Sequence, residues 1–345
     1  MERKDFVPVE LYDYPLPQEL IAKYPIEPRD HSRLMVLNRQ TGEIKHDYFY
    51  NLDKYLREGD LVVLNDTKVI PARLLGRKKT GGRVEILLNR KLPQKNRWLA
   101  LIGGKKIKPG LEVFIGDSLK VVVLKQVEGP LFEIELTAEE GNVMDKIYQL
   151  GKIPIPPYLE REEEPIDRRR YQTIFARREG SVAAPTASLH FTERVLKKLQ
   201  QKGISIAFVT LHVGLGTFKP IKVKNVLEHK VDPEYVEVSS DVMEKIKETK
   251  GRGGRVVAVG TTVVRALETA GFNPFKGFTD LYIKPGYRFK VVDAMVTNFH
   301  LPKSSLLVLV STFAGREFLL KAYKIAVEKR YRFYSYGDAM LIVGK

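Results

Sequence analysis

Four short stretches of the sequence combine small residues with side chains that could move protons or hold a polar substrate. The first, SVAAPTASLHF at residues 181–191, is nearly uncharged and contains Thr186, Ser188 and His190. Pro185 disfavours a helix and the alanines disfavour a strand, so we expect a stiff loop. The Ser-x-His pair lacks the Gly-x-Ser-x-Gly turn of a serine hydrolase, which argues against a covalent nucleophile.

The second stretch, VTLHVGLGTFKP at residues 209–220, begins in an apolar run that we expect to be a buried strand. It contains His212, Gly214, Gly216 and Thr217. A Gly-x-Gly pair lets the backbone approach a ligand closely. Because the third glycine of a dinucleotide fingerprint is missing, an ordinary turn is the alternative interpretation.

Two further stretches place polar residues after expected strands. In VAVGTTVVRALE, Gly260, Thr261 and Thr262 lie between a strand and a helix, where free N–H groups and hydroxyls suit a carboxylate or a ribose. N-capping by threonine is the simpler interpretation. In VTNFHLPKSSLL, Asn298 and His300 lie on a loop that we expect to enter another apolar strand. A lone histidine there could equally be a structural hydrogen-bonding residue.

These residue types favour proton transfer and substrate positioning. The chain contains no cysteine, which excludes disulfides, thiolate catalysis and cysteine-ligated zinc or iron–sulfur sites. It also lacks a His-x-x-x-His helix and a cluster of paired carboxylates. We therefore expect no metal site and no prosthetic group.

The elements that must position these stretches fall into two groups. Residues 65–149 contain short runs rich in Val, Ile and Leu separated by glycine-containing turns, which predicts a small antiparallel β-barrel or sandwich. Residues 1–64 and 150–345 read as strands and helices of an α/β domain. We therefore expect a discontinuous mixed α/β domain with a small β-barrel domain inserted into it. Ligands of open α/β sheets bind at the carboxyl ends of strands, which is where the polar stretches fall.

Individual elements of the α/β part are also predicted. Pro17 suits the first residue of a short helix, and Thr192 and Gly203 suit the start and end of another. Further helices are expected at 242–251, 261–271 and 316–329, and strands at 34–38, 204–213, 255–260, 306–313 and 339–343.

The charge balance points to a polyanionic partner. Lys and Arg number 58 against 42 Asp and Glu, a formal net charge of +16, which favours nucleic acid. Heat adaptation would explain many charges of both signs, but not the imbalance. The segment 167–178 joins arginines to aromatic residues as single-stranded RNA readers do, whereas the aromatic residues of 329–339 fit a core better. The longest apolar run, Leu306–Val310, is too short to span a bilayer, and the start lacks a signal-peptide core. We therefore expect a soluble, cytoplasmic protein.

Taken together, the polar stretches and their neighbours resemble one family, the S-adenosylmethionine:tRNA ribosyltransferase-isomerases of queuosine biosynthesis. The resemblance runs from about residue 11 to 342 and is weakest through the inserted β-region. It is carried by the blocks YDYPLPQELIA, GDLVVLNDTKVIPARL, SVAAPTASLHF, FVTLHVGLGTF, AVGTTVVRALE, PGYRFKVVDAMVTNFHLPKSSL and YRFYSYGDAM.

The resemblance implies a fold, a reaction and two substrates. The family fold is similar to the one expected here, an α/β domain that carries a smaller β-barrel domain. The family transfers the ribosyl part of S-adenosylmethionine to 7-aminomethyl-7-deazaguanine at the tRNA wobble position. The sugar is isomerised, which gives epoxyqueuosine-tRNA, adenine and methionine. S-adenosylmethionine is thus a co-substrate, and no metal is implied.

Residue roles follow as expectations from the resemblance. We expect His190 and His212 to transfer protons, Thr261 and Thr262 to bind the methionine carboxylate or the ribose, and the small residues of 181–191 to admit a bulky sulfonium nucleoside. The expected substrate-binding residues are Thr186, Ser188, Gly214, Gly216, Thr217, His229, Glu234, Thr261, Thr262, Arg265, Asn298 and His300, and the expected tRNA-binding residues are Arg168, Arg169, Arg170 and Tyr171.

One position departs from the family pattern. In the block EHKVDPEYVEV, Asp232 stands where the family usually carries a second histidine after His229. An acid–base role at this position is therefore restricted to what an aspartate can also do.

Two alternatives remain open on the sequence alone. An S-adenosylmethionine-dependent tRNA methyltransferase would share both substrates, but its usual glycine-rich first loop is missing near the start. A non-catalytic RNA-binding protein that binds through the β-barrel would explain the charge and leave the polar stretches unexplained.

Overall fold

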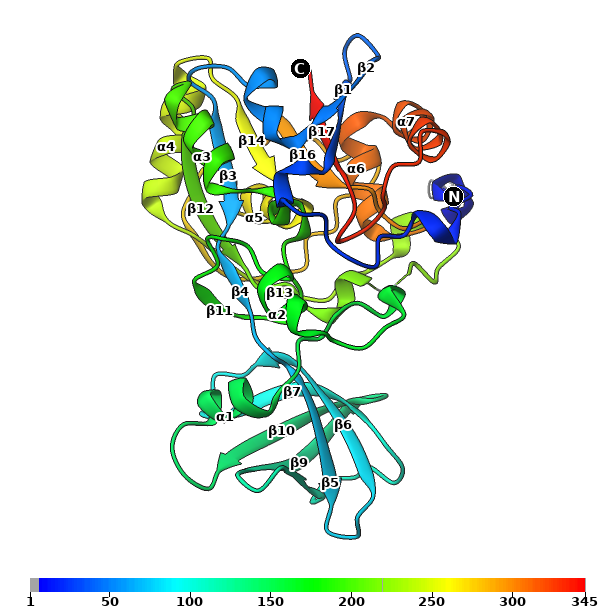
Figure 1. Ribbon diagram of the computed structural model, residues 1–345, viewed down its shortest axis with the longest axis vertical. Helices are drawn as coiled ribbons and strands as arrows, with labels where there is room; N and C mark the ends of the chain where they lie inside the picture. Colours follow the sequence, from blue (N-terminus) through cyan, green and yellow to red (C-terminus); the bar gives the residue numbers. More distant parts are fainter. Residues whose placement is uncertain (1–5, 219, 345) are drawn as a thin grey trace, which may run out of the picture.

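A computed structural model describes residues 6–218 and 220–344, except for the side chains of Thr217 and Phe218. The chain forms a large α/β part and a separate β-barrel joined to it by a narrow connection (Figure 1). Both ends of the described chain lie in the α/β part. This arrangement confirms the predicted fold class, whereas the domain boundaries at 65 and 149 stay a prediction.

A nine-stranded mixed sheet forms the centre of the α/β part, in the order β15-β13-β12-β3-β14-β16-β17-β1-β2. The neighbouring strands β12, β3, β14 and β16 are parallel to one another, so their carboxyl ends share one edge. The strands are β1 Arg33–Asn38, β2 Glu43–Tyr48, β3 Leu61–Asn65, β12 Ser205–Leu211, β13 Glu234–Val238, β14 Val256–Val259, β15 Phe275–Thr279, β16 Ala294–Asn298 and β17 Ala339–Val343.

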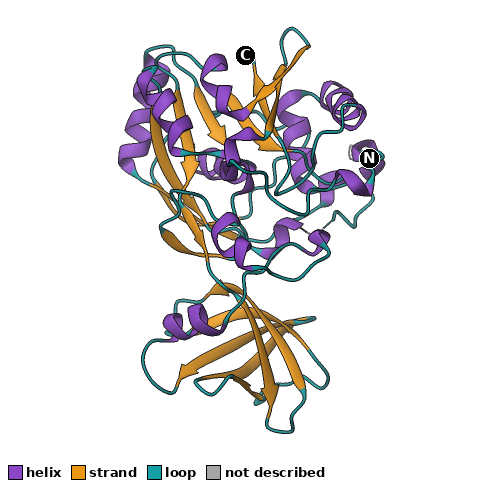
Figure 2. Cartoon of the chain, in the orientation of Figure 1, coloured by secondary structure: helices purple, strands orange, loops and turns teal. Residues whose placement is uncertain are grey.

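Helices cover both faces of this sheet (Figure 2). Successive residues of a strand point to opposite faces, so Leu34 and Val36 join one core while Met35 and Leu37 join the other. Because both faces are buried at the centre of the sheet, β3, β14 and β16 are buried along their whole length and consist mainly of apolar residues. The first core lies against α3 Glu193–Gln201 and the 3₁₀ helix η4 Phe49–Tyr55; the second lies against α4 Ser240–Gly251, α5 Thr261–Ala270, α6 Ser305–Ala314 and α7 Arg316–Glu328.

Short 3₁₀ helices occur along the loops, and most of them lie in the α/β part. They are η1 Val9–Tyr12, η2 Gln18–Leu20, η3 Arg29–His31, η5 Pro157–Leu159, η6 Thr186–His190, η7 Leu215–Phe218 and η8 Val226–Glu228.

The inserted barrel is closed, antiparallel and has its own core around Trp98. Inward-facing apolar residues alternate with outward-facing ones along its strands, as the sequence pattern predicted. Its strands are β5 Arg73–Lys78, β6 Arg83–Lys91, β7 Arg97–Gly103, β8 Glu112–Ile115, β9 Leu119–Glu128 and β10 Leu131–Ala138, followed by α1 Val143–Leu150.

Two segments of the chain connect the barrel to the sheet. The chain leaves β3 at its carboxyl end through β4 Thr67–Val69, and it returns from the barrel at Lys152, ahead of α2 Pro165–Arg170. The later strand β11 Arg178–Ser181 pairs parallel with β4. Arg73 and Lys152 exchange two backbone hydrogen bonds, of 3.1 and 2.8 Å, at the entrance to the barrel. The barrel is therefore attached at the edge of the sheet where the polar stretches lie.

The structure corrects two sequence predictions. The run 306–313 is the helix α6 and not a strand, because a short apolar run fits a buried helix as well as a buried strand. The Ser304 hydroxyl accepts from the Leu307 N–H at 3.2 Å and Gly315 ends the helix at φ 90°, signals that were present in the sequence. The short helix expected at Pro17 is the one-turn 3₁₀ helix η2, and Pro17 is its N-cap and not its first residue. Thr192 is the N-cap of α3, as predicted.

Paired truncations test whether the barrel is a separate domain. Leu88 is fully buried in the barrel core and Leu64 is fully buried in the sheet core. Each Leu→Ala change should lower the free energy of unfolding by about 2–5 kcal/mol. In calorimetry, we expect Leu88→Ala to move one thermal transition and Leu64→Ala to move another. A single transition that both variants move equally would show one cooperative unit.

Candidate active site

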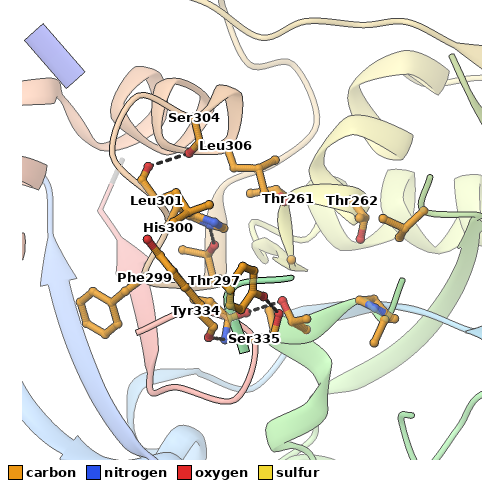
Figure 3. A pocket seen from close by; sticks show the side chains of 18 residues that line it. Thr261, Thr262, Thr297, Phe299, His300, Leu301, Ser304, Leu306, Tyr334 and Ser335 are labelled. Atoms are coloured by element: carbon orange, nitrogen blue, oxygen red, sulfur yellow. Dashed lines mark hydrogen bonds between the residues drawn. The ribbon is translucent and has the colours of Figure 1, made fainter. Parts of the chain in front are cut away.

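A cavity lies where the parallel strands β14 and β16 end (Figure 3). The empty space there, counted out to the open solvent, is about 660 Å³. All four polar stretches reach it: three contribute Thr186, Thr261, Thr262, Asn298 and His300 to its lining, and the second contributes only Val213. The small residues Ala184, Pro185, Ala187 and Gly260 line it as well, so backbone is close to the space a ligand would fill.

Asn298, the last residue of β16, is held by three partners. Its Oδ1 accepts a hydrogen bond of 2.9 Å from the Thr186 hydroxyl. Its Nδ2 lies 3.3 Å from His190 Nε2 and donates to the Tyr334 carbonyl at 3.3 Å. Asn298 is 3 % exposed, so these contacts fix its amide against the cavity wall.

His190 lies behind Asn298 and does not line the cavity. Because the Asn298 amide donates to Nε2, the proton of a neutral His190 is on Nδ1, which lies 2.7 Å from Ser32 Oγ. The Ser32 hydroxyl in turn donates to the Arg29 carbonyl at 3.3 Å. Burial, helped by nearby arginines, lowers the pKa of His190 to about 3. The imidazole is therefore neutral and its tautomer is fixed.

His300 is the only histidine among the described residues that line the cavity. Its Nε2 lies 2.7 Å from Thr297 Oγ1 (Figure 3). Its backbone N–H donates to the Tyr323 hydroxyl at 2.8 Å. Burial lowers the pKa of His300 to about 3, so its ring is neutral at pH 7.

The first turn of α5 contributes differently from what the sequence suggested. The N-cap is Gly260, at φ 95°, and neither threonine caps the helix, so the simple capping interpretation was wrong. The hydroxyl of Thr262 accepts instead from Asn65 Nδ2 at 3.4 Å. That same amide donates to the Leu211 carbonyl at 2.9 Å, and Asn65 Oδ1 accepts from the Leu211 N–H at 3.1 Å. Asn65 thus ties the ends of β3 and β12 to the start of α5.

A second cavity adjoins the first at Leu306, which lines both; its empty space, counted out to the open solvent, is about 400 Å³. Gly216, Glu234 and Arg265 from the expected set line it, and so does Asp232. Glu234 accepts from the Gly214 N–H at 2.8 Å and is ion-paired with Arg265. Eight of the residues expected to bind substrate are thereby divided between two neighbouring cavities, five in the first and three in the second.

Several expected site residues lie outside both cavities. His212 is half-buried on the connection to the barrel, where its Nδ1 lies 2.8 Å from Thr67 Oγ1 and its ring stacks on Tyr235. Burial lowers the pKa of His212 to about 4. Ser188 is fully buried, and His229 packs edge-on against Tyr282. The side chain of Thr217 lies outside the described part of the chain.

Of the expected tRNA-binding residues, two are buried. Tyr171 is 1 % exposed and Arg170 is 4 % exposed, so Tyr171 does not present its ring to a base. Arg169 is solvent-exposed and pairs with Glu27 at 3.5 Å. Arg168 donates to the Gly151 carbonyl at 2.7 Å. The aromatic residues Tyr331, Phe333, Tyr334 and Tyr336 are buried, which confirms the core interpretation of that segment.

The sequence reading missed part of the cavity lining. Tyr334 and Ser335 line the first cavity, and the left-handed backbone at Tyr334, φ 71°, is the kind of feature that gathers at functional sites. Tyr158, from the proline-rich stretch after the barrel, also lines it. In the described residues, no helix is long and apolar enough to cross a membrane. No group of three or more His, Asp or Glu side chains there is placed to hold a metal ion.

The buried histidines predict a pH-dependent stability. In the unfolded chain His190 and His300 become protonated below their ordinary pKa of 6.5. In the folded protein both stay neutral until the pH approaches their lowered pKa of about 3. Stability is therefore fully present above pH 6.5 and falls as the pH drops toward 3, by about 1.4 kcal/mol per pH unit for each histidine. His190→Gln should flatten the dependence of unfolding free energy on pH, measured by urea denaturation from pH 6.5 to 4.5. Equal slopes in wild type and variant would contradict this.

The comparisons with known proteins agree over nearly the whole chain. The family described as "Queuosine biosynthesis protein" matches residues 9–342. The chain is 65 % identical over 336 residues to the S-adenosylmethionine:tRNA ribosyltransferase-isomerase of Aquifex aeolicus, covering 97 % of this chain and 99 % of the relative. It is 57 % identical to that of Hydrogenobaculum sp., with the same coverage. The crystal structure of S-adenosylmethionine tRNA ribosyltransferase from Thermotoga maritima is similar at 41 % identity and a TM-score of 0.55, covering 96 % of this chain and all of that one. The chain therefore belongs to the queuosine biosynthesis family of S-adenosylmethionine:tRNA ribosyltransferase-isomerases.

Proposed function

We propose that this enzyme transfers the ribosyl part of S-adenosylmethionine to 7-aminomethyl-7-deazaguanine at the wobble position of tRNA and isomerises it to the epoxycyclopentanediol of epoxyqueuosine. Adenine and methionine are the other products. The observation that carries this function is the 65 % identity, over 97 % of this chain, to an S-adenosylmethionine:tRNA ribosyltransferase-isomerase.

The first cavity suits the nucleoside part of S-adenosylmethionine. Its small residues leave the backbone accessible to a flat base and a sugar. Thr186, Thr261 and Thr262 offer hydroxyls at its wall, and Asn298 offers an amide whose orientation is fixed. These groups would hold the ribose and the leaving adenine in place.

The reaction needs two proton movements. A sulfonium makes the neighbouring C5′ hydrogens acidic, so a modest base suffices to begin, and adenine leaves once its nitrogens are protonated or hydrogen-bonded. Proton transfer by His190 and His212 stays a prediction, and neither histidine lines the two cavities. His300 and Asn298 do line the first cavity and are better placed to contact the substrate.

The tRNA is the partner that the net charge of +16 favours. The barrel is a reasonable contact for it because its connection to the sheet begins at the carboxyl end of β3, near the first cavity. Since tRNA is the substrate, we place the enzyme in the cytoplasm. The reaction as written requires neither a metal ion nor a prosthetic group.

Product analysis tests the reaction directly. With tRNA that carries the aminomethyl-deazaguanine base, chromatography should detect adenine and methionine, and without it neither should form. The same tRNA with guanine at the wobble position is the control. S-adenosylhomocysteine as the product would establish a methyltransferase, and tRNA binding without any product would establish a binding protein.

The hydrogen bonds of Asn298 predict that His190 acts by positioning this amide. His190→Ala and Asn298→Ala should each lower kcat/KM by about ten- to a hundredfold, because the amide turns away or is lost. The double variant should be no slower than the worse single variant, since the two residues act as a unit. His190→Gln can still accept from Asn298 and should recover part of the activity.

A direct proton-transfer role for His190 makes the opposite prediction. His190→Gln would then be as slow as His190→Ala, because an amide does not titrate. The plot of kcat against pH would also lose, in the variant, the rise or fall that the titration of His190 causes in the wild type.

A further inference from the structure

The second cavity contains an arginine, Arg265, whose guanidinium is held in place and has one nitrogen available for an anionic ligand. Arg265 is 6 % exposed, its Nε donates to the Leu281 carbonyl at 3.1 Å, and its Nη1 is bound to Glu234. Its Nη2 is buried and has no hydrogen-bond partner in the described structure. A buried guanidinium nitrogen without a partner is costly, which is a reason to look for a ligand that satisfies it.

A second unsatisfied donor lines the same cavity. The hydroxyl of Tyr282 is buried and also has no hydrogen-bond partner among the described residues. Its ring is fixed edge-on against His229. Burial raises the pKa of Tyr282 above its ordinary value, so the hydroxyl keeps its proton and can donate. Two fixed donors, one of them charged, are a typical arrangement for holding a carboxylate.

The same three segments of the chain line both cavities. On α5, Thr261 lines the first cavity and Arg265 lines the second. The two residues are four positions apart, so they lie on the same side of the helix and about 6 Å apart along its axis. In the stretch after β12, Val213 lines the first cavity and Gly216 the second. At the start of α6, Leu306 lines both. One extended ligand could therefore occupy both cavities.

We propose that the second cavity binds the amino-acid end of S-adenosylmethionine, with the α-carboxylate on Arg265 Nη2 and the Tyr282 hydroxyl. This inference rests on the proposed function and specifies how its co-substrate is oriented. The sulfonium then lies near Leu306, and the ribose and adenine occupy the first cavity. The sequence had suggested that the carboxylate binds at Thr261 and Thr262, in the first turn of α5. The proposed position at Arg265 is about one helical turn further along the same helix.

The charges of the second cavity suit this end of the molecule. Asp232, Glu234 and Arg265 sum to one negative charge when ionised. The α-carboxylate, the α-ammonium and the sulfonium of the ligand sum to one positive charge. Nη1 of the guanidinium donates to Glu234 and Nε donates to the Leu281 carbonyl, so Nη2 is left for the ligand.

A ligand that lacks only the carboxylate tests the proposal. Binding of S-adenosylmethionine and of its decarboxylated form is measured by calorimetry on the full-length enzyme, in the presence of tRNA with guanine at the wobble position so that no reaction occurs. The wild type should bind S-adenosylmethionine at least tenfold more tightly, which corresponds to losing a charge-assisted hydrogen bond. Tyr282→Phe should weaken binding of S-adenosylmethionine about three- to tenfold and leave binding of the decarboxylated form unchanged.

Two further variants make the result specific. Arg265→Lys keeps a positive charge beside Glu234 but loses the second edge of the guanidinium, so its loss should also be confined to the carboxylate-bearing ligand. Tyr287→Phe is the matched control, because Tyr287 donates to Glu268 at 3.0 Å and lines neither cavity. It should affect both ligands equally.

Equal affinity of the wild type for both ligands, or an equal loss for both ligands in Tyr282→Phe, would overturn the subsite. Adenine release from S-adenosylmethionine with the modified tRNA is measured on the same preparations. If adenine forms while the ligands are not distinguished, the subsite is wrong and the proposed function stands. If no adenine forms, the proposed function itself fails.

Discussion

The amide side chain of Asn65 holds together the segments from which the site is built. It is fully buried, and it hydrogen-bonds the backbone of Leu211 at the end of β12, the N–H of Thr67 at the start of the barrel connection and the hydroxyl of Thr262 on α5. A side chain of similar size without both a donor and an acceptor would leave several of these buried groups unsatisfied. Asn65 therefore contributes to fixing the ends of β3 and β12, the start of α5 and the start of the barrel connection relative to one another.

Burial determines what the histidines of this protein can do. His190 and His300 are neutral because their surroundings exclude water, and each has a ring nitrogen committed to a neighbouring hydroxyl. A neutral, fixed imidazole is well suited to orienting an amide such as Asn298 and poorly suited to cycling between protonation states at pH 7. The hydrogen-bond network around the first cavity would thus recognise a ligand by its shape and by the direction of its hydrogen bonds more than by its charge.

Much of the fold was readable from the sequence, because strand alternation in the barrel, the cap at Thr192 and the polar strand ends are local signals. The helical state of Leu306–Val310 was not, since an apolar run buried on every side has no period that distinguishes helix from strand. Of the site, Thr186 and Asn298 were predicted individually, but their mutual hydrogen bond joins residues 112 positions apart. Tyr282 was not predicted at all: it meets Arg265 in one cavity only after the chain has folded, and no spacing rule connects the two.

The way in which the barrel is attached has a mechanical consequence. The outgoing and returning segments are paired antiparallel at Arg73 and Lys152, and the outgoing strand β4 is also paired with β11. A connection of two paired segments resists bending and twisting more than a single unpaired linker does. A macromolecule bound by the barrel would therefore be held in a restricted range of distances and orientations relative to the cavities. The length of this connection would then determine which nucleotide of a bound RNA can reach the site.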